Sequence, residues 1–197
     1  MKYINQLEHR DIPYRTRVKM ENVEESKKNT NIASSGCGLC SICMMLDLLT
    51  NQTLTLEEAV QISYDCVANH RPGTDMQILA PVIAERFGLE CSNTSDLDEA
   101  IRHLQNGGQI VVHVRIPEEG KLGLFTKGGH YMSIISTDGK EFCILDPSYT
   151  PEKYHIPERE GKVNDKNAPF LYCDVDTVHA ETRKDGPKYY LFSRKKA

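Results

Sequence analysis

Three residues of this chain have the types and the order needed for nucleophilic catalysis. Cys37 lies between two glycines, His130 follows a Gly-Gly pair, and Asp146 comes directly before a proline. A thiol nucleophile needs a base that takes its proton, and the base needs a third group that fixes its tautomer. Cys37, His130 and Asp146 could supply these three roles, and the chemistry would be attack of a thiolate on a carbonyl carbon.

The segment around Cys37 predicts the start of a helix. Apolar residues recur behind it at three- and four-residue spacing, which favours a helix over residues 37–49 with one face inward. Backbone N–H groups without partners and the helix dipole favour negative charge at this end of a helix. A thiol placed there has a lowered pKa and is a better nucleophile at neutral pH.

His130 and Asp146 are predicted to lie at the ends of two paired strands. The β-branched runs 131–136 and 141–145 flank Thr137-Asp138-Gly139-Lys140, which contains the Asp-Gly signal of a tight hairpin. His130 opens the first strand and Asp146 closes the second, so the hairpin should bring both residues to the same open end.

The remaining pattern predicts helices first and strands afterwards. Residues 1–33 are polar and are expected to lead over the surface into the Cys37 turn. The other expected elements are a helix from the Thr55/Glu58 capping box to 70–73, a helix from Thr74 or Asp75 to Gly88, a helix from Ser95 with Asp98 to 107–108, and strands over 109–116 and 189–192. This order is typical of an α+β protein with an antiparallel sheet, in one domain over 1–197. The long polar segment 149–169 is either a flap beside the site or a surface excursion.

The motifs around these three residues resemble those of a known family. Gly36-Cys37-Gly38, Gly129-His130-Tyr131 and Leu145-Asp146-Pro147 are similar to the papain-like cysteine peptidases of the bacteriocin-leader (double-glycine) type, and most of all to their bacterial peptidase-like relatives. The resemblance covers nearly the whole chain. It implies a papain-like fold with the nucleophile Cys37 on a central helix, and with His130 as general base and acid and Asp146 as orienting carboxylate on the sheet.

Two positions depart from the family pattern or leave it open. Leu39 stands where the family commonly has proline. The oxyanion-hole amide has two candidates: Asn31, six residues before the nucleophile, and Gln6, further upstream. Either could donate to an oxyanion together with the Cys37 backbone N–H.

Composition bounds the partners and the compartment. The net charge of −4 gives no reason to expect nucleic-acid or membrane binding. No apolar run approaches the roughly 20 residues that cross a bilayer, and the N-terminus lacks the apolar core of a signal peptide, so we expect a cytoplasmic protein. The odd number of cysteines, 7, in a chain of this kind favours reduced thiols.

Other interpretations of the same residues remain. Cys37, Cys40 and Cys43 have the spacing of a metal or redox motif, but no fourth cysteine follows as an iron–sulfur site would need, and core packing explains Cys40 and Cys43 more simply. We therefore expect no metal and no cofactor. The expected activity is hydrolysis of a peptide or amide through a thioester. The alternatives are a papain-like binding module without turnover and an acyl or amide transferase using the same triad. The sequence does not specify the oligomeric state.

Overall fold

The computed structural model describes residues 2–17 and 30–195 of the chain, so residues 18–29 of the predicted N-terminal surface segment lie outside the described residues. The described elements, in chain order, are η1 (Gln6–Glu8), α1 (Ile32–Ser35), α2 (Cys37–Thr50), α3 (Leu56–Asp65), α4 (Met76–Arg86), β1 (Leu89–Thr94), α5 (Leu97–Gln105), β2 (Gln109–Arg115), β3 (Gly129–Thr137), β4 (Glu141–Leu145), β5 (Asn164–Asn167), β6 (Phe170–Asp174), α6 (Val175–Ala180) and β7 (Tyr189–Arg194).

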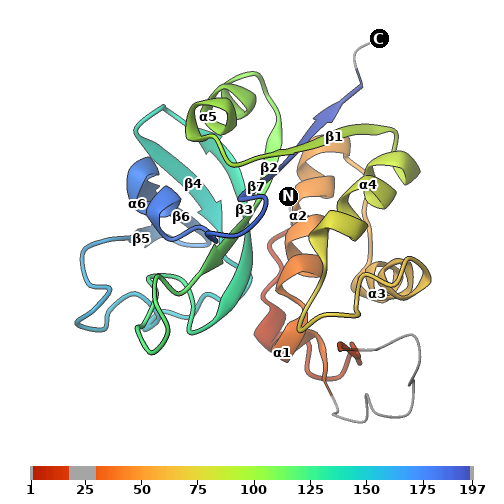
Figure 1. The fold of residues 1–197 in the computed structure, drawn as a ribbon, viewed down its shortest axis with the longest axis horizontal. Helices are drawn as coiled ribbons and strands as arrows, with labels where there is room; N and C mark the ends of the chain where they lie inside the picture. The colour runs from red at the N-terminus through yellow and green to blue at the C-terminus, as the bar shows by residue number, and fades with distance from the viewer. Residues whose placement is uncertain (1, 18–29, 196–197) are drawn as a thin grey trace.

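The strands form one antiparallel sheet with helices on both faces (Figure 1). The strand order is β1-β7-β2-β3-β4-β6-β5. Helices α2, α3 and α4 pack with one face in a first hydrophobic cluster, and α5 and α6 pack with the other face in a second. Strand β2 serves both clusters, because Val111 belongs to the first and its neighbours Ile110 and Val112 to the second. This confirms the predicted α+β class.

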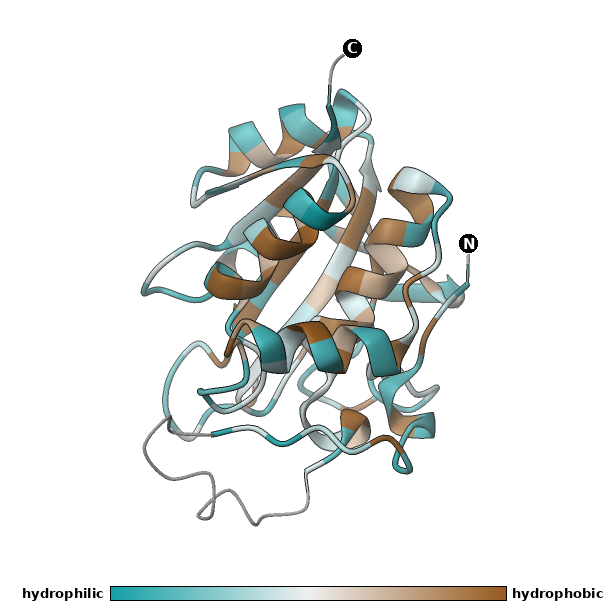
Figure 2. Ribbon diagram, turned by 90° about the vertical axis from the view of Figure 1, so that its right-hand side faces the viewer, coloured by the Kyte–Doolittle hydropathy of each residue, from teal (hydrophilic) through white to brown (hydrophobic). Residues whose placement is uncertain are grey.

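Helix α2 lies at the centre of the first layer. Its residues from Gly38 to Leu46 are all buried, since the sheet, α3 and the N-terminal segment surround it. The helix is therefore covered on more than the single face that its apolar spacing predicted. Cys40 and Cys43 are core residues there, and the Ser133 hydroxyl of β3 donates to the Ser41 carbonyl at 3.0 Å. Figure 2 shows hydrophobic residues gathered along the helices and strands, with hydrophilic residues on the connecting loops.

The local helix signals were mostly confirmed. Thr55 and Glu58 form the predicted capping box of α3, and Asp75, rather than Thr74, caps α4. The prediction that Ser95 caps the fourth helix was wrong. Asp96 is the N-cap of α5, and its carboxylate accepts from the Glu99 backbone N–H at 2.8 Å. The second helix also ends at 65 instead of 70–73.

The predicted strands correspond to β2, β3, β4 and β7, and the Asp-Gly hairpin joins β3 to β4. Three strands, two short helices and a short 3-10 turn were not expected: β1, β5, β6, α1, α6 and η1. Strand β1 has little apolar alternation and is fixed by pairing with β7, which lies about a hundred residues away in sequence. Within the described residues, no helix combines the length and the apolar run that crossing a bilayer requires.

Candidate active site

Cys37 is the first residue of α2, and the glycines on either side of it allow the close backbone packing at this position. Gly36 joins α1 to α2, and a Cβ at this position would lie 2.6 Å from the Ile32 carbonyl oxygen. At Gly38 a Cβ would lie 3.0 Å from the Thr74 Cβ. The chain can therefore turn sharply before the helix and pack its first turn against the loop before α4 only without these side chains.

His130 and Asp146 meet at the open end of the β3–β4 hairpin, as predicted. The His130 Nε2 lies 2.7 Å from the Asp146 Oδ1. Both residues are buried, the carboxylate completely. An ionised carboxylate can only accept, so Nε2 carries the proton of the neutral ring and Nδ1 remains an acceptor. The unprotonated nitrogen is the one a thiol could use.

The Cys37 thiol and the His130 imidazole are coupled. Burial raises the pKa of the thiol, but a hydrogen bond to His130 and the charge of its imidazolium outweigh this, so the pKa is lowered. Burial lowers the pKa of His130, but the Asp146 carboxylate and the contact with Cys37 reverse this, so the pKa is raised. Both shifts favour a thiolate beside an imidazolium.

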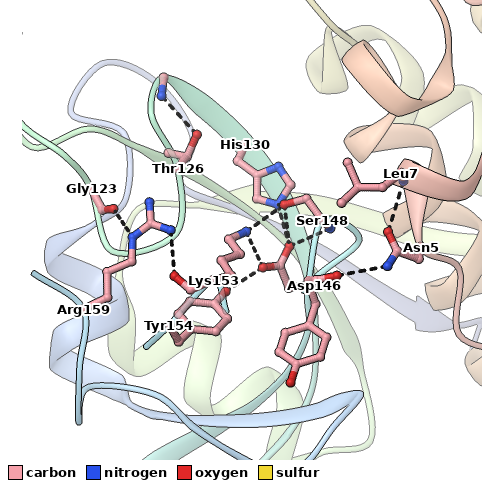
Figure 3. A network of polar contacts seen from close by, with 12 residues as sticks. Asn5, Leu7, Gly123, Thr126, His130, Asp146, Ser148, Lys153, Tyr154 and Arg159 are labelled. Atoms are coloured by element: carbon pink, nitrogen blue, oxygen red, sulfur yellow. Dashed lines mark hydrogen bonds and ion pairs between the residues drawn. The ribbon is translucent and has the colours of Figure 1, made fainter. Parts of the chain in front are cut away.

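Asp146 divides its two oxygens between two cationic groups (Figure 3). Oδ1 accepts from His130 and, at 2.9 Å, from the Ser148 backbone N–H. Oδ2 lies 2.5 Å from both the Lys153 ammonium and the Tyr154 hydroxyl. Burial would raise the pKa of this carboxyl, but Lys153 and His130 hold it far below its usual range. Burial lowers the pKa of Lys153 more than the carboxylate raises it.

Sequence reasoning missed Ser148, Lys153 and Tyr154. Ser148 was adjacent to the recognised Asp-Pro pair, but Lys153 and Tyr154 lie in the polar segment 149–169, where no periodicity marks them. The structure places this segment beside Asp146. Arg159 is buried and binds the Gly123 carbonyl through Nε at 3.0 Å and the Lys153 carbonyl through Nη1 at 3.2 Å, which fixes the backbone that carries Lys153 (Figure 3).

The two oxyanion-hole candidates have different surroundings. Asn31 is the N-cap of α1, and its side-chain oxygen accepts from the Ser34 N–H at 3.1 Å. Gln6 is buried and lies between the two parts of the site. Its backbone N–H donates to the Pro147 carbonyl at 2.7 Å and its side-chain Nε2 to the Ala33 carbonyl at 2.9 Å. One N–H of the Gln6 amide therefore remains without a described acceptor.

A cavity of about 700 Å³ borders Cys37 and His130. One wall is the loop before α4, and the other is formed by the end of β2 and the loop between α6 and β7. The remaining lining residues are Thr16, Arg17, Thr30, Ser34, Ser35, Arg71, Pro72, Gly73, Thr74, Asp75, His113, Arg115, Gly129, Tyr131 and Arg183. The cavity therefore opens beside the thiol and has room for a peptide-sized group.

The seven cysteines are free thiols, and Cys40 and Cys43 lie in the core. Within residues 2–17 and 30–195, no three or more His, Cys, Asp or Glu side chains are grouped to hold a metal ion. Core packing accounts for the two cysteines that follow Cys37, as their spacing on the helix suggested.

Comparison with known proteins identifies the family. The model of the peptidase C39-like family matches residues 1–166, so the chain belongs to this family. A crystal structure of a protein from Bacillus anthracis assigned to the C39-like peptidases matches with a TM-score of 0.53 and 12% identity, over 82% of this chain and 90% of that one. At 12% identity this match shows a shared fold and nothing more. The shared fold is consistent with the papain-like architecture that the sequence predicted. The comparison with curated proteins finds no significant match. Family and fold together suggest a cysteine peptidase.

Proposed function

We propose that this protein hydrolyses a peptide or amide bond through a thioester on Cys37. The observation that carries the proposal is the 2.7 Å contact between Asp146 and His130. The Cys37 thiol lies at the N-terminus of α2, and its hydrogen bond to His130 lowers the pKa of the thiol. This combination supplies a nucleophile, a base and an orienting carboxylate, and membership of a peptidase family supports the same chemistry.

In the first half of the reaction, the Cys37 thiolate attacks the substrate carbonyl carbon and forms a tetrahedral oxyanion. His130 then gives its Nδ1 proton to the leaving amine as the C–N bond breaks, and the thioester remains. Asp146 accepts from Nε2 throughout and keeps the ring turned towards the sulfur. The Cys37 backbone N–H and the free N–H of Gln6 are the proposed donors to the oxyanion.

In the second half, water attacks the thioester carbonyl and His130 takes one of its protons. The C–S bond breaks, the acid product leaves, and the thiolate–imidazolium pair is restored. An amine could replace water as the acceptor, which would make the protein a transferase. Cleavage of a peptide mixture with and without an added amine, followed by mass spectrometry, separates these products.

The pH dependence of iodoacetamide alkylation tests the pair. We expect Cys37 to react well below the pH at which an ordinary thiol ionises, because its pKa is lowered. Cys91 is the internal control, because burial raises its pKa to about 11. His130→Ala should move Cys37 labelling to higher pH and leave Cys91 unchanged.

The same variants separate catalysis from binding. Cys37→Ala should abolish cleavage and leave folding intact, and His130→Ala should abolish it as well. Cleavage that persists in Cys37→Ala would reject the nucleophile. Labelling of Cys37 that ignores His130 would instead indicate a binding module on a papain-like fold.

A further inference from the structure

The cavity beside Cys37 carries an excess of positive charge. Among the described residues, its lining includes four arginines, Arg17, Arg71, Arg115 and Arg183, against one acidic residue, Asp75. Asp75 already accepts from Arg71 at 3.0 Å. In the described part of the chain, no carboxylate lies within ion-pair distance of the other three arginines. This local charge contrasts with the net charge of −4 of the whole chain.

Two of these arginines are held on the sheet side of the cavity. Arg183 is fixed through His113: its backbone N–H donates to the His113 carbonyl at 3.0 Å, and its Nη1 lies 3.4 Å from the ring Nδ1. Its guanidinium packs over Gly186, where a Cβ would lie 3.2 Å from Cζ. Arg115 pairs in register with Gly129, the residue before the imidazole. Both residues line the cavity that also borders Cys37 and His130.

His113 neither adds to nor cancels this charge. Burial and the neighbouring guanidiniums of Arg183 and Arg115 lower its pKa to about 3, so its ring is neutral near pH 7. The ring stacks on Tyr131 with a centroid distance of 4.3 Å. A neutral ring in a fixed position leaves the two arginines as the charged groups on this wall.

The hydrogen-bonding capacity of Arg183 is largely unused. A guanidinium has five N–H donors. Among the described residues, His113 Nδ1 is the acceptor for one of them, and the buried Nε has no partner. Arg183 lines the cavity, so an anion bound there can accept from terminal N–H groups of the guanidinium that have no acceptor among the described residues. A carboxylate fits a guanidinium with two parallel hydrogen bonds.

We propose that Arg115 and Arg183 bind a carboxylate of the substrate and give the site a preference for acidic peptides. The inference rests on the proposed peptidase function and names its substrate class. The carboxylate belongs either to an Asp or Glu side chain or to a peptide C-terminus. These two sources share one chemistry and are separated by the probes below.

The test measures how fast Cys37 is alkylated by three matched probes. N-iodoacetyl-glutamine amide is neutral, N-iodoacetyl-glutamate α-amide carries a side-chain carboxylate, and N-iodoacetyl-glutamine carries a terminal carboxylate. The rate for each charged probe divided by the neutral rate gives a charge ratio, which cancels the reactivity of the thiol. We expect a ratio of about tenfold or more for the probe that matches the natural carboxylate, with a decrease at high salt.

The variants assign the ratio to the two arginines. His130 is also cationic in the reactive pair, so only the change on substitution is diagnostic. Arg115→Gln and Arg183→Gln should bring the ratio towards one, and any change in thiol reactivity cancels because each variant is compared with its own neutral-probe rate. Arg102→Gln removes the same charge from an exposed site on α5 and should keep the ratio. Arg183→Lys keeps the charge without the fork and should retain part of the ratio.

The proposal is overturned by a ratio near one in the unmodified protein, or by an unchanged ratio in the Arg115→Gln/Arg183→Gln double variant. Thermal unfolding checks that the variants are folded. If the glutamine variants do not fold, Arg115→Lys and Arg183→Lys decide, because an intact ratio in both would reject a guanidinium fork. Failure of the peptidase proposal shows separately, as a neutral-probe rate at Cys37 no higher than at Cys91.

Discussion

At the residue scale, the Asp146 carboxylate contacts a buried lysine and a tyrosine in addition to His130. Its Oδ2 binds Lys153 and Tyr154, while Oδ1 binds His130 and Ser148. The ammonium of Lys153 is almost fully buried, with a side chain 10% exposed. Removing one partner of a buried ion pair costs more than removing both, because it leaves a charge without compensation.

Asp146→Asn should therefore lower the free energy of unfolding by roughly 3–5 kcal/mol, measured by urea denaturation at pH 7. The double variant Asp146→Asn/Lys153→Met removes both charges and should recover a large part of this loss. Equal stability of the single and double variants would contradict the assignment.

The pH dependence gives a second check on the same residue. The pKa of Asp146 is lowered in the folded protein, so its contribution is present above the unfolded carboxyl pKa of about 4 and is lost as the pH falls below it. The difference in free energy of unfolding between the unmodified protein and Asp146→Asn should therefore become smaller as the pH is lowered below about 4.

At the element scale, the junction of α1 and α2 fixes where the thiol lies. The Gly36 N–H donates to the Ile32 carbonyl at 2.8 Å, and α2 starts at the next residue. The turn and the helix could be predicted, because glycine content and apolar spacing are local signals. The β3–β4 hairpin and its two end residues could be predicted for the same reason.

The elements that support Asp146 could not be predicted in this way. Lys153 and Tyr154 act through contacts that depend on where the segment 149–169 folds back, and Arg159 holds it through carbonyls up to 36 residues away. Strands β5 and β6 are short and depend on pairing with each other and with β4. Tertiary context, not local propensity, determines these elements.

Gly36→Ala should displace the start of α2. A Cβ would meet the Ile32 carbonyl oxygen at 2.6 Å, so the junction must shift and Cys37 with it. A displacement of about 1 Å costs on the order of 10²-fold in rate, which the rate of Cys37 alkylation or peptide cleavage would measure. Gly128→Ala, where no atom lies within 4 Å of the added Cβ, is the control and should retain the rate.

At the scale of the whole molecule, the N-terminal segment ties the helical layer to the sheet layer. The Tyr3 hydroxyl donates to the Asp146 carbonyl at 2.6 Å, and the Asn5 side chain donates to the Tyr149 carbonyl at 3.0 Å. On the other side, the Ile4 N–H contacts the Met44 sulfur of α2 at 3.4 Å. The segment expected to run over the surface is thus partly a connection between layers.

Tyr3→Phe/Asn5→Ala removes these two hydrogen bonds and the one that the Asn5 side chain accepts from the Leu7 N–H, and should lower the free energy of unfolding by about 1.5–4.5 kcal/mol, measured by urea denaturation. Hydrogen exchange should rise at the turn after β4. Arg10→Ala, an exposed change in the same segment, should leave both unchanged. A double variant as stable as the control would show that these two bonds do not hold the layers together.

The strand order has a consequence for how the chain is made. Strand β7 lies between β1 and β2, although it is synthesised after every other strand described. A chain emerging from the ribosome therefore carries its thiol well before the imidazole, and carries both before the strand that completes the middle of the sheet. Until β7 is made, β1 and β2 lack the strand that pairs with both of them, so the sheet that carries His130 is incomplete.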